Sequence, residues 1–310
     1  MPEIALVEPA RAEGHVGPTL AAAGHGHHVL DCLACGFAHF WPRPTAAELA
    51  AYYARAFYET HGPADWADKE DAEQGYWRIE HDDRLATFVA LLDRPSGRLL
   101  DVGCGSGWLL ARAAACGWDV LGVEPSEAMA ARAATRAPVL RAVFPAPEVT
   151  ARAPFDVVHV KQVLEHVDDP AAFLAAVRAV LAPGGVVCIE VPNDFNPLQR
   201  AACTALGKPP WWVVYPVHLN YFRFDSLERL LRRGGFTPVL REATWPMEWF
   251  LLQGDDYVGR DDVGRACHAR RMTLEMRLDG AGLGPTRRSF RRWLADEGIG
   301  REAVVYARRA

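Results

Sequence analysis

A chain of 310 residues, half of them hydrophobic, is long enough to bury the core of one large domain or of two smaller ones. Its formal net charge of −5 at pH 7 argues against a general nucleic-acid-binding protein. No apolar run reaches the length of a membrane-spanning helix, so we expect no membrane partner.

Two further features of the whole sequence favour a cytoplasmic protein. The first ten residues carry Glu3 and Glu8 and no basic segment, unlike a secretory signal. The seven cysteines are odd in number and lie mostly in apolar segments, which indicates a reducing compartment rather than a disulfide framework. We expect a monomer or a homodimer.

The first 95 residues are expected to form an N-terminal segment. Residues 1–27 are rich in Ala, Gly and His without a regular period, which predicts a loose lead-in. Thr45 and Glu48 form a capping-box pattern, which predicts a helix reaching Phe57. A second helix is predicted over about Tyr76–Leu92. These helices would form a lid on the domain that follows.

This segment contains four potential metal ligands in a stretch of twelve residues, namely His28, Cys32, Cys35 and His39. Cys-x2-Cys on a tight turn is the usual half of a zinc site, and Gly36 favours such a turn. Two alternatives stay open: a structural zinc ion held by all four side chains, or a metal-free remnant. Four protein ligands would leave no open position for catalysis.

From residue 96 to residue 310 the sequence alternates between strand-like and helix-like segments. Strands are predicted at 99–102, 119–123, 139–143, 155–160, 186–191, 236–241 and 303–308, and helices at 108–116, 126–136, 170–181 and 225–233. This alternation predicts an α/β domain with a doubly wound, mostly parallel sheet. A helical, aromatic insert is expected at about 243–300, between the last two strands.

The first of these strands runs into a glycine turn, Asp101–Gly107 (DVGCGSG). Glycine lets a ligand lie across backbone N–H groups at a helix N-terminus. The dinucleotide fingerprint G-x-G-x-x-G is not met, because Trp108 stands where its third glycine would fall. Glu124 ends the next strand, where a carboxylate can accept hydrogen bonds from both ribose hydroxyls. The alternative is an ordinary glycine-rich turn with a chance acid.

Several motifs closely resemble the class I S-adenosylmethionine-dependent methyltransferases. They are LLDVGCGSG (99–107), LGVEPS (121–126), FDVVHVKQVLEHVDDP (155–170) and LAPGGVVCIEVPN (181–193). HLNYF (218–222) and SLERLLRRGGF (226–236) are similar to the branch containing ubiquinone-type and sugar C-methyltransferases. The resemblance implies a seven-stranded Rossmann-like sheet with its last strand antiparallel. Some related enzymes carry an N-terminal zinc ribbon with two cysteine pairs, and here the second pair is missing.

The resemblance also implies cofactor-binding residues. Asp101, Gly103, Cys104, Gly105 and Gly107 would line the methionine and ribose side, Glu124 and Pro125 the ribose, Phe144 the adenine, and Lys161 and Gln162 the methionine. Many members place an acid after the third strand. Here the segment is Arg141-Ala-Val-Phe144, so adenine would be held by stacking and backbone contacts.

Candidates for catalysis lie at the carboxyl edge of the predicted sheet, namely Glu165, His166, His218 and Tyr221. A base is needed only if the acceptor must lose a proton during methyl transfer. The near-neutral pKa of histidine suits that role, and a packing histidine is the alternative at position 218. Glu165 and His166 follow the fourth strand, where cofactor-side or structural duty is the other interpretation.

The acceptor is the least defined part of the prediction. Residues 260–310 carry twelve arginines against seven acids, which indicates either an anionic acceptor or a solvated helix face. We expect methyl transfer to a small molecule such as a sugar, a polysaccharide precursor or a natural-product intermediate. The alternatives are non-methyl chemistry on the same fold, such as cyclisation or decarboxylation, and a non-catalytic binding module.

Overall fold

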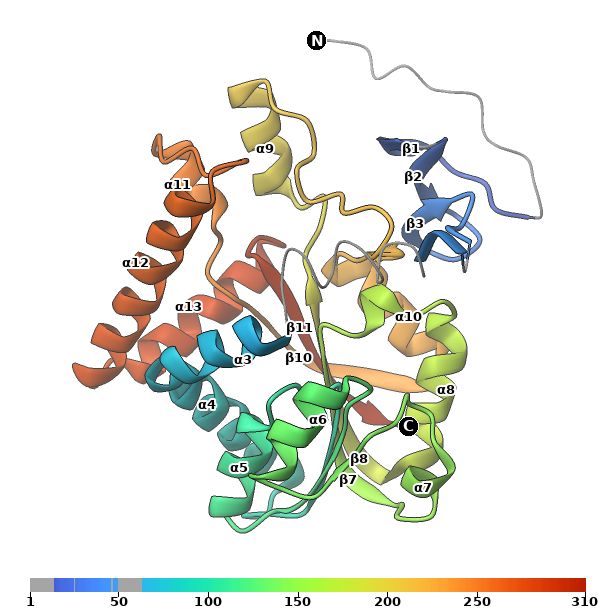
Figure 1. The fold of residues 1–310 in the computed structure, drawn as a ribbon, viewed down its shortest axis with the longest axis vertical. Coiled ribbons are helices and arrows are strands. Elements are labelled where there is room, and N and C mark those ends of the chain that lie inside the picture. The colour runs from blue at the N-terminus through green and yellow to red at the C-terminus, as the bar shows by residue number, and fades with distance from the viewer. Residues whose placement is uncertain (1–13, 25, 46, 50–62) are drawn as a thin grey trace.

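A seven-stranded sheet forms the centre of the computed structural model, which describes residues 14–24, 26–45, 47–49 and 63–310 (Figure 1). Its strands are β4 (Arg98–Val102), β5 (Asp119–Val123), β6 (Val139–Leu140), β7 (Phe155–Lys161), β8 (Leu181–Pro192), β10 (Phe236–Ala243) and β11 (Glu302–Arg309). Their order is β10-β11-β8-β7-β4-β5-β6, and β11 alone is antiparallel to its two neighbours. The predicted α/β class and its antiparallel last strand are confirmed.

The strand order reverses at β4, which has β5 on one side and β7 on the other. Strands buried on both faces need continuous apolar runs, and Leu99 and Leu100 of β4 are both fully buried, one in each of the two core layers. A crevice forms at such a reversal, outside the carboxyl ends of the strands. The loops after β4, β5 and β7 therefore meet at one place.

Helices cover both faces of this sheet (Figure 1). Those between the first and last strands include α5 (Trp108–Ala115), α6 (Glu127–Ala134), α7 (Pro147–Thr150), α8 (Pro170–Val180) and α10 (Phe224–Arg233), whereas α9 (Pro197–Leu206) lies away from the sheet, at the top of the view. Asp169 caps α8, at the start of the helix predicted from residue 170, by accepting the N–H groups of Ala171 and Ala172. The predicted strand 139–143 is shorter than expected, and the strand predicted at 186–191 begins five residues earlier.

A second, smaller sheet joins the N-terminal segment to a distant part of the chain. It contains β1 (Thr19–Gly24), β2 (His27–Cys32), β3 (Phe37–Trp41) and β9 (Asn220–Tyr221), all antiparallel, in that order. The expectation of a loose lead-in is therefore wrong for 19–24. Because β9 comes from the HLNYF motif, this part of the chain forms one sheet with residues nearly 200 positions earlier.

Helices α3 (Pro63–Ala72) and α4 (Gln74–Leu92) lie on the other side of the molecule, with the C-terminal insert (Figure 1). The insert is helical, as predicted, with α11 (Glu248–Leu252), α12 (Asp261–Gly280) and α13 (Gly284–Asp296). The predicted capping box is present, since Thr45 and Glu48 exchange hydrogen bonds. The remainder of the helix it was expected to open, from residue 50 to Phe57, lies outside the described residues. Within the described ranges, no helix combines the length and apolar character needed to cross a bilayer.

Candidate active site

The glycine turn adopts backbone angles that few other residues tolerate. Gly103, Gly105 and Gly107 all have positive φ, at +71°, +54° and +84°. A Cβ at Gly103 would lie 2.5 Å from Cγ2 of Val163, so the turn packs directly against the segment after β7. Position 103 thus requires glycine both because its φ is positive and because a Cβ would collide with Val163.

Glu124 lies beside this turn because β4 and β5 are parallel neighbours. Its carboxylate accepts the backbone N–H of Gly105 at 3.0 Å and that of Ser126 at 2.9 Å. The side chain is buried, and burial raises its pKa while those two N–H bonds oppose the rise. The acid at the end of the second strand is therefore in contact with the turn.

A cavity of about 220 Å³ opens next to the turn. Six predicted cofactor residues line it, namely Asp101, Gly103, Cys104, Gly105, Lys161 and Gln162. Six further lining residues were not predicted, namely Glu70, Trp77, His81, Trp108, Leu109 and His159. His159 had a usable signal, since it is a polar residue inside the apolar run of β7. Trp108 and Leu109 also had one, because they open α5 directly after the turn. Glu70, Trp77 and His81 come from α3 and α4, which no local pattern relates to the turn.

Buried polar pairs form one wall of the cavity. Nδ1 of His159 lies 2.7 Å from Oδ1 of Asp101, and both side chains are buried. Nζ of Lys161 lies 3.2 Å from Oε1 of Glu190, and Arg84 also pairs with that carboxylate. Burial opposes ionisation of Glu190, but the two cations outweigh it and hold its pKa well below the usual range.

Helix α3 crosses the mouth of the glycine turn. Glu70 accepts a hydrogen bond from the Ser106 hydroxyl, and Asp71 accepts one from Nε1 of Trp108 at 2.9 Å. Asp71 also pairs with Arg132 of α6. These contacts hold α3, a helix that the sequence did not predict, against the glycine turn, while the lid expected from the helices at 45–57 and 76–92 stays a prediction.

Four predicted cofactor residues lie outside the lining of the cavity, namely Gly107, Glu124, Pro125 and Phe144. Phe144 is buried in the core, edge-on to Phe173 at 5.4 Å between ring centroids. Its predicted adenine contact gains no support from this position. Gln162 lines the cavity with a positive φ of 51°, and its amide donates to Glu302 at 2.9 Å.

Three of the predicted catalytic residues meet beyond the end of β7. The ligand-type atoms of Glu165, His166 and His218 all lie within 4.8 Å of one another. Nδ1 of His166 is 2.9 Å from the Val217 carbonyl oxygen, and the two imidazole rings are edge-on at 5.0 Å. Burial, assisted by His166, lowers the pKa of His218 to about 4, so its ring is neutral at pH 7. Burial raises the pKa of Glu165 well above its usual value.

Tyr221 borders this group, with its ring centroid 6.5 Å from that of His218, but most of its contacts lie in the small sheet. Its hydroxyl accepts the backbone N–H of Val214 at 3.2 Å, and its ring packs against Phe40 and Phe195. The residue is 2% exposed. These contacts are those of a core residue of the small sheet, and the predicted catalytic role gains no support.

Further buried acids lie near Glu165 and were not predicted. Asp194 follows β8, and Glu248 opens α11; Gln199 of α9 hydrogen-bonds both carboxylates. Burial raises the pKa of Asp194 to about 8 and also raises that of Glu248. The segment NDFNP directly after β8 is the one local signal for these acids.

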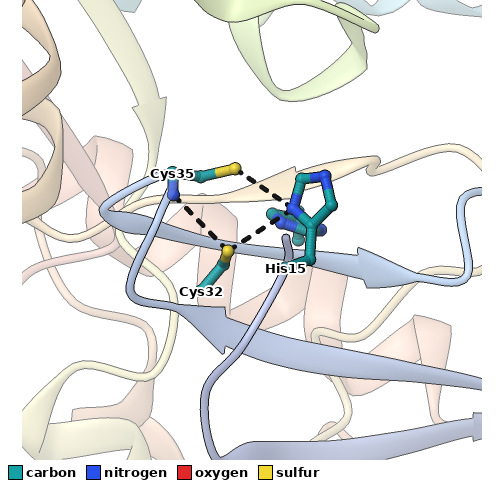
Figure 2. A group of neighbouring side chains, drawn as sticks. His15, Cys32 and Cys35 are labelled. Carbon is teal, nitrogen blue, oxygen red and sulfur yellow. Dashed lines mark hydrogen bonds between the residues drawn. The ribbon is translucent and has the colours of Figure 1, made fainter. Parts of the chain in front are cut away.

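The cysteine pair has a different set of histidine neighbours from the predicted one (Figure 2). His15, Cys32, Cys35 and His39 have ligand atoms within 4.8 Å of one another, whereas His28 is not in the group. The strand register explains this: His28 pairs with Trp41, four residues along β2 from Cys32. Four residues of strand span about 13 Å. The predicted ligand His28 is thus replaced by His15.

An α/β sheet with a crevice at its strand-order reversal, a glycine turn and an acid on the next strand defines a nucleoside-cofactor-binding fold. A family model described as a methyltransferase domain matches residues 74–241, just over half of the chain. The chain therefore belongs to the methyltransferase domain family. The predicted resemblance to class I S-adenosylmethionine-dependent methyltransferases is confirmed.

Curated relatives carry methyltransferase names. The chain is 32% identical over 166 residues to a ubiquinone biosynthesis O-methyltransferase of Cereibacter sphaeroides, covering 49% of this chain and 66% of the relative. It is 39% identical over 143 residues to the protein of the same name in Caulobacter sp., covering 44% and 54%. The match thus spans less than two thirds of these relatives' lengths.

Solved structures share the fold at low sequence identity. Magnesium protoporphyrin IX methyltransferase from Synechocystis PCC 6803, with bound SAH, aligns with a TM-score of 0.51 and 13% identity, over 84% of this chain and 100% of that one. The plantazolicin methyltransferase in complex with SAH aligns with a TM-score of 0.50 and 12% identity, over 84% and 94%.

Proposed function

We propose that this protein transfers the methyl group of S-adenosylmethionine to a hydroxyl group of a small polar acceptor, such as a sugar or a natural-product intermediate. One observation carries the donor half of the proposal: the Glu124 carboxylate lies against the glycine turn that borders the cavity. A carboxylate there accepts ribose hydroxyls, and the positive-φ turn lets the cofactor lie against backbone N–H groups.

The cofactor would supply an electrophilic sulfonium methyl group for in-line displacement. The residues of this chain would bind and align the two reactants, which lowers the barrier mainly by positioning. Asp101, held by His159, and Glu70 of α3 would present carboxylates along the cavity to the positively charged methionine end. Helix α3 would then exclude water from the donor.

The acceptor half rests on unpaired polar atoms. Among the described residues, Oε2 of Glu165, Oε2 of Glu248 and Nδ1 of His218 are buried without a hydrogen-bond partner. Leaving such groups unpaired costs free energy, which a ligand carrying hydroxyl or amine donors would recover. Together with Asp194, these groups favour a neutral, donor-rich acceptor.

The arginine excess of residues 260–310 supports an anionic acceptor less well. Arg287 and Arg291 both pair with the buried Glu80, and Arg271 pairs with Glu275 of its own helix. Their charge is thus already matched by acids within the protein. We therefore propose that the acceptor's recognition depends on the acids near Glu165 rather than on these arginines.

His218 is the proposed general base. O-methylation requires the acceptor hydroxyl to lose a proton, and a neutral imidazole can accept it. Burial lowers the pKa of His218 to about 4, which keeps the ring neutral at pH 7 but makes it a weaker base than the near-neutral histidine that the sequence predicts. The names of the curated relatives point to O-methylation of their own substrates. Mass spectrometry of products formed with a panel of hydroxylated acceptors tests this choice. Accepted substrates that gain no methyl group would support cyclisation or decarboxylation instead.

Calorimetric titration with S-adenosylhomocysteine tests the donor half. We expect the wild type to bind, and Glu124→Ala to bind at least about tenfold more weakly, because charged-group hydrogen bonds contribute roughly 1.5–3 kcal/mol. Glu127→Ala is the matched control, since Glu127 is exposed on α6 and pairs with Arg141. Equal affinity in both variants would contradict the cofactor assignment.

A further inference from the structure

We propose that His15, Cys32, Cys35 and His39 form a tetrahedral zinc site that fixes the small sheet to the acceptor side of the enzyme. The metal site itself stands whether or not the proposed acceptor chemistry is correct, whereas its place on the acceptor side rests on the proposed function. Figure 2 shows the two thiols pointing toward the ring of His15 from a turn at the end of β2. The four side chains come from three separate stretches of the N-terminal chain.

Two distances between ligand atoms are close to those of a zinc tetrahedron, and all four ligand atoms lie within 4.8 Å of one another. Nδ1 of His15 lies 3.5 Å from Sγ of Cys32 and 3.4 Å from Sγ of Cys35. With Zn–S near 2.3 Å and Zn–N near 2.0–2.1 Å, tetrahedral geometry places adjacent S and N ligands roughly 3.6 Å apart. The observed separations therefore leave room for one ion at the centre of the group.

His39 provides an independent indication that this group binds a metal ion. Its side chain is fully buried, its Nδ1 lies 2.8 Å from the Phe40 carbonyl oxygen, and its Nε2 has no partner among the described residues. Metal-binding histidines commonly donate one ring N–H to a backbone carbonyl and ligate through the other nitrogen. A buried Nε2 without a hydrogen-bond partner, close to two thiols, has the arrangement expected of a metal ligand.

A metal-free cluster does not satisfy the same atoms. Both thiols approach the single Nδ1 of His15, whose one lone pair can accept only one of them in good geometry. The unpartnered nitrogen of His39 would also stay unpaired in the protein interior. One cation bound to two thiolates and two neutral imidazoles pairs all four groups at once.

The backbone around the thiols is built to hold them. Cys35 donates its backbone N–H to Sγ of Cys32 at 3.4 Å, and the Gly36 N–H bonds the Cys32 carbonyl at 2.7 Å. Gly36 itself has a φ of +77°. Arg233 of α10 donates to the Cys35 carbonyl, which ties the turn to the main domain.

The position of His15 is fixed by the chain that follows it. The Val16 carbonyl accepts the N–H of Leu33 at 2.8 Å. A Cβ at Gly17 would lie 1.9 Å from the Asp31 carbonyl oxygen, so only glycine allows this close approach. The lead segment is therefore held against the cysteine turn, with its histidine directed at the thiols.

The metal would act on the acceptor side through strand pairing. His39 pairs with Asn220 of β9, and the Asn220 amide donates to the carbonyl oxygens of Leu164 and Val167, on either side of Glu165 and His166. His218 lies two residues before Asn220. A zinc ion holding β3 in place would thereby position His218, without contacting the reactants.

Metal analysis of the purified full-length protein tests the site. We expect about one zinc ion per chain. We also expect a cobalt-substituted form with the visible absorption of a tetrahedral thiolate complex. His15→Ala should weaken zinc binding by at least about 100-fold in a chelator competition, since even outer-shell changes cost 10–100-fold. His28→Ala is the matched control and should retain the metal.

The outcomes separate cleanly. Absence of zinc and cobalt binding by the wild type after reconstitution in reductant would overturn the proposal, and so would equal affinity in His15→Ala and His28→Ala. A His39 variant is not used, because removal of this buried side chain would also leave a cavity in the protein. The cobalt spectrum of the wild type tests the site without any substitution. S-adenosylhomocysteine binding, measured in parallel, reports on the proposed function separately, because the cofactor cavity has no lining residue from the small sheet.

Discussion

Nδ1 of His159 lies 2.7 Å from Oδ1 of Asp101, joining adjacent strands β7 and β4 under the cofactor cavity. Replacing His159 by Phe keeps a ring of similar size but leaves a buried carboxylate without its donor, at a cost of about 1–3 kcal/mol. We expect S-adenosylhomocysteine affinity to fall about tenfold by calorimetry. His159→Gln, which keeps a donor, should recover part of the loss; equal losses in both variants would contradict an orienting role.

The contact between Glu70 and Ser106 predicts a lid effect. Glu70→Ala removes both the hydrogen bond that holds α3 on the glycine turn and a carboxylate that lines the cavity. We expect S-adenosylhomocysteine to dissociate faster by roughly tenfold, as for the loss of about 1.4 kcal/mol, in stopped-flow measurements. Glu70→Gln keeps an acceptor for Ser106, so its dissociation rate should lie between those of the wild type and Glu70→Ala. A release rate unchanged in Glu70→Ala would argue against a closed lid.

His218 and Tyr221 are three residues apart in the sequence, but we expect only the substitution of His218 to lower turnover. Loss of a general base lowers turnover by about 10²–10⁴, so His218→Ala should show that fall in kcat with cofactor affinity retained. Tyr221→Phe loses only the hydrogen bond from Val214 and should keep kcat within about twofold, at a cost near 1 kcal/mol in stability. Steady-state kinetics and thermal unfolding distinguish the two. Full turnover in His218→Ala would exclude it as the base.

The buried Asp194 predicts an unusual dependence of stability on pH. Burial raises its pKa to about 8, so between about pH 4 and pH 8 the folded state holds a proton that the unfolded state has lost. Its contribution to stability is therefore fully present below about pH 4 and is lost as pH rises through 8. Asp194→Asn has no titrating group at this position and so removes this pH-dependent contribution to stability.

The measurement is urea unfolding of wild type and Asp194→Asn at several pH values. The stability of the variant relative to wild type should increase with pH, by at most about 1.4 kcal/mol per unit over that window. A difference that stays constant with pH would show that Asp194 is ionised in the folded protein.

Glu80 predicts a large loss of stability from one buried acid. Its carboxylate lies 2.7 Å from Nη1 of Arg291 and 3.0 Å from Nη1 of Arg287, and all three residues are buried. Glu80→Gln should cost about 3–5 kcal/mol in unfolding free energy, because it leaves the buried charge of Arg291 without its ion-pair partner, although Arg287 keeps Asp83 and Glu275. Arg229→Ala, which breaks the exposed pair with Asp225, should cost less than about 1 kcal/mol. Similar losses in the two variants would contradict this reading.

Much of the donor site followed from the sequence alone. The glycine turn and Glu124 are encoded by strand, turn and strand signals within about 25 residues, and the parallel pairing of β4 with β5 brings them together. The same local signals predicted the sheet and the helical insert. Local patterns suffice here because each element buries its own apolar face against a neighbour close in sequence.

Tertiary structure decided what surrounds that turn. His15 rather than His28 faces the cysteines, because an extended strand carries His28 away while the lead segment folds back. The pairing of His39 with Asn220, the approach of Glu70 and the burial of Arg287 on Glu80 likewise join distant segments. Such contacts are selected by the packing of whole elements, and no local spacing in the chain encodes them.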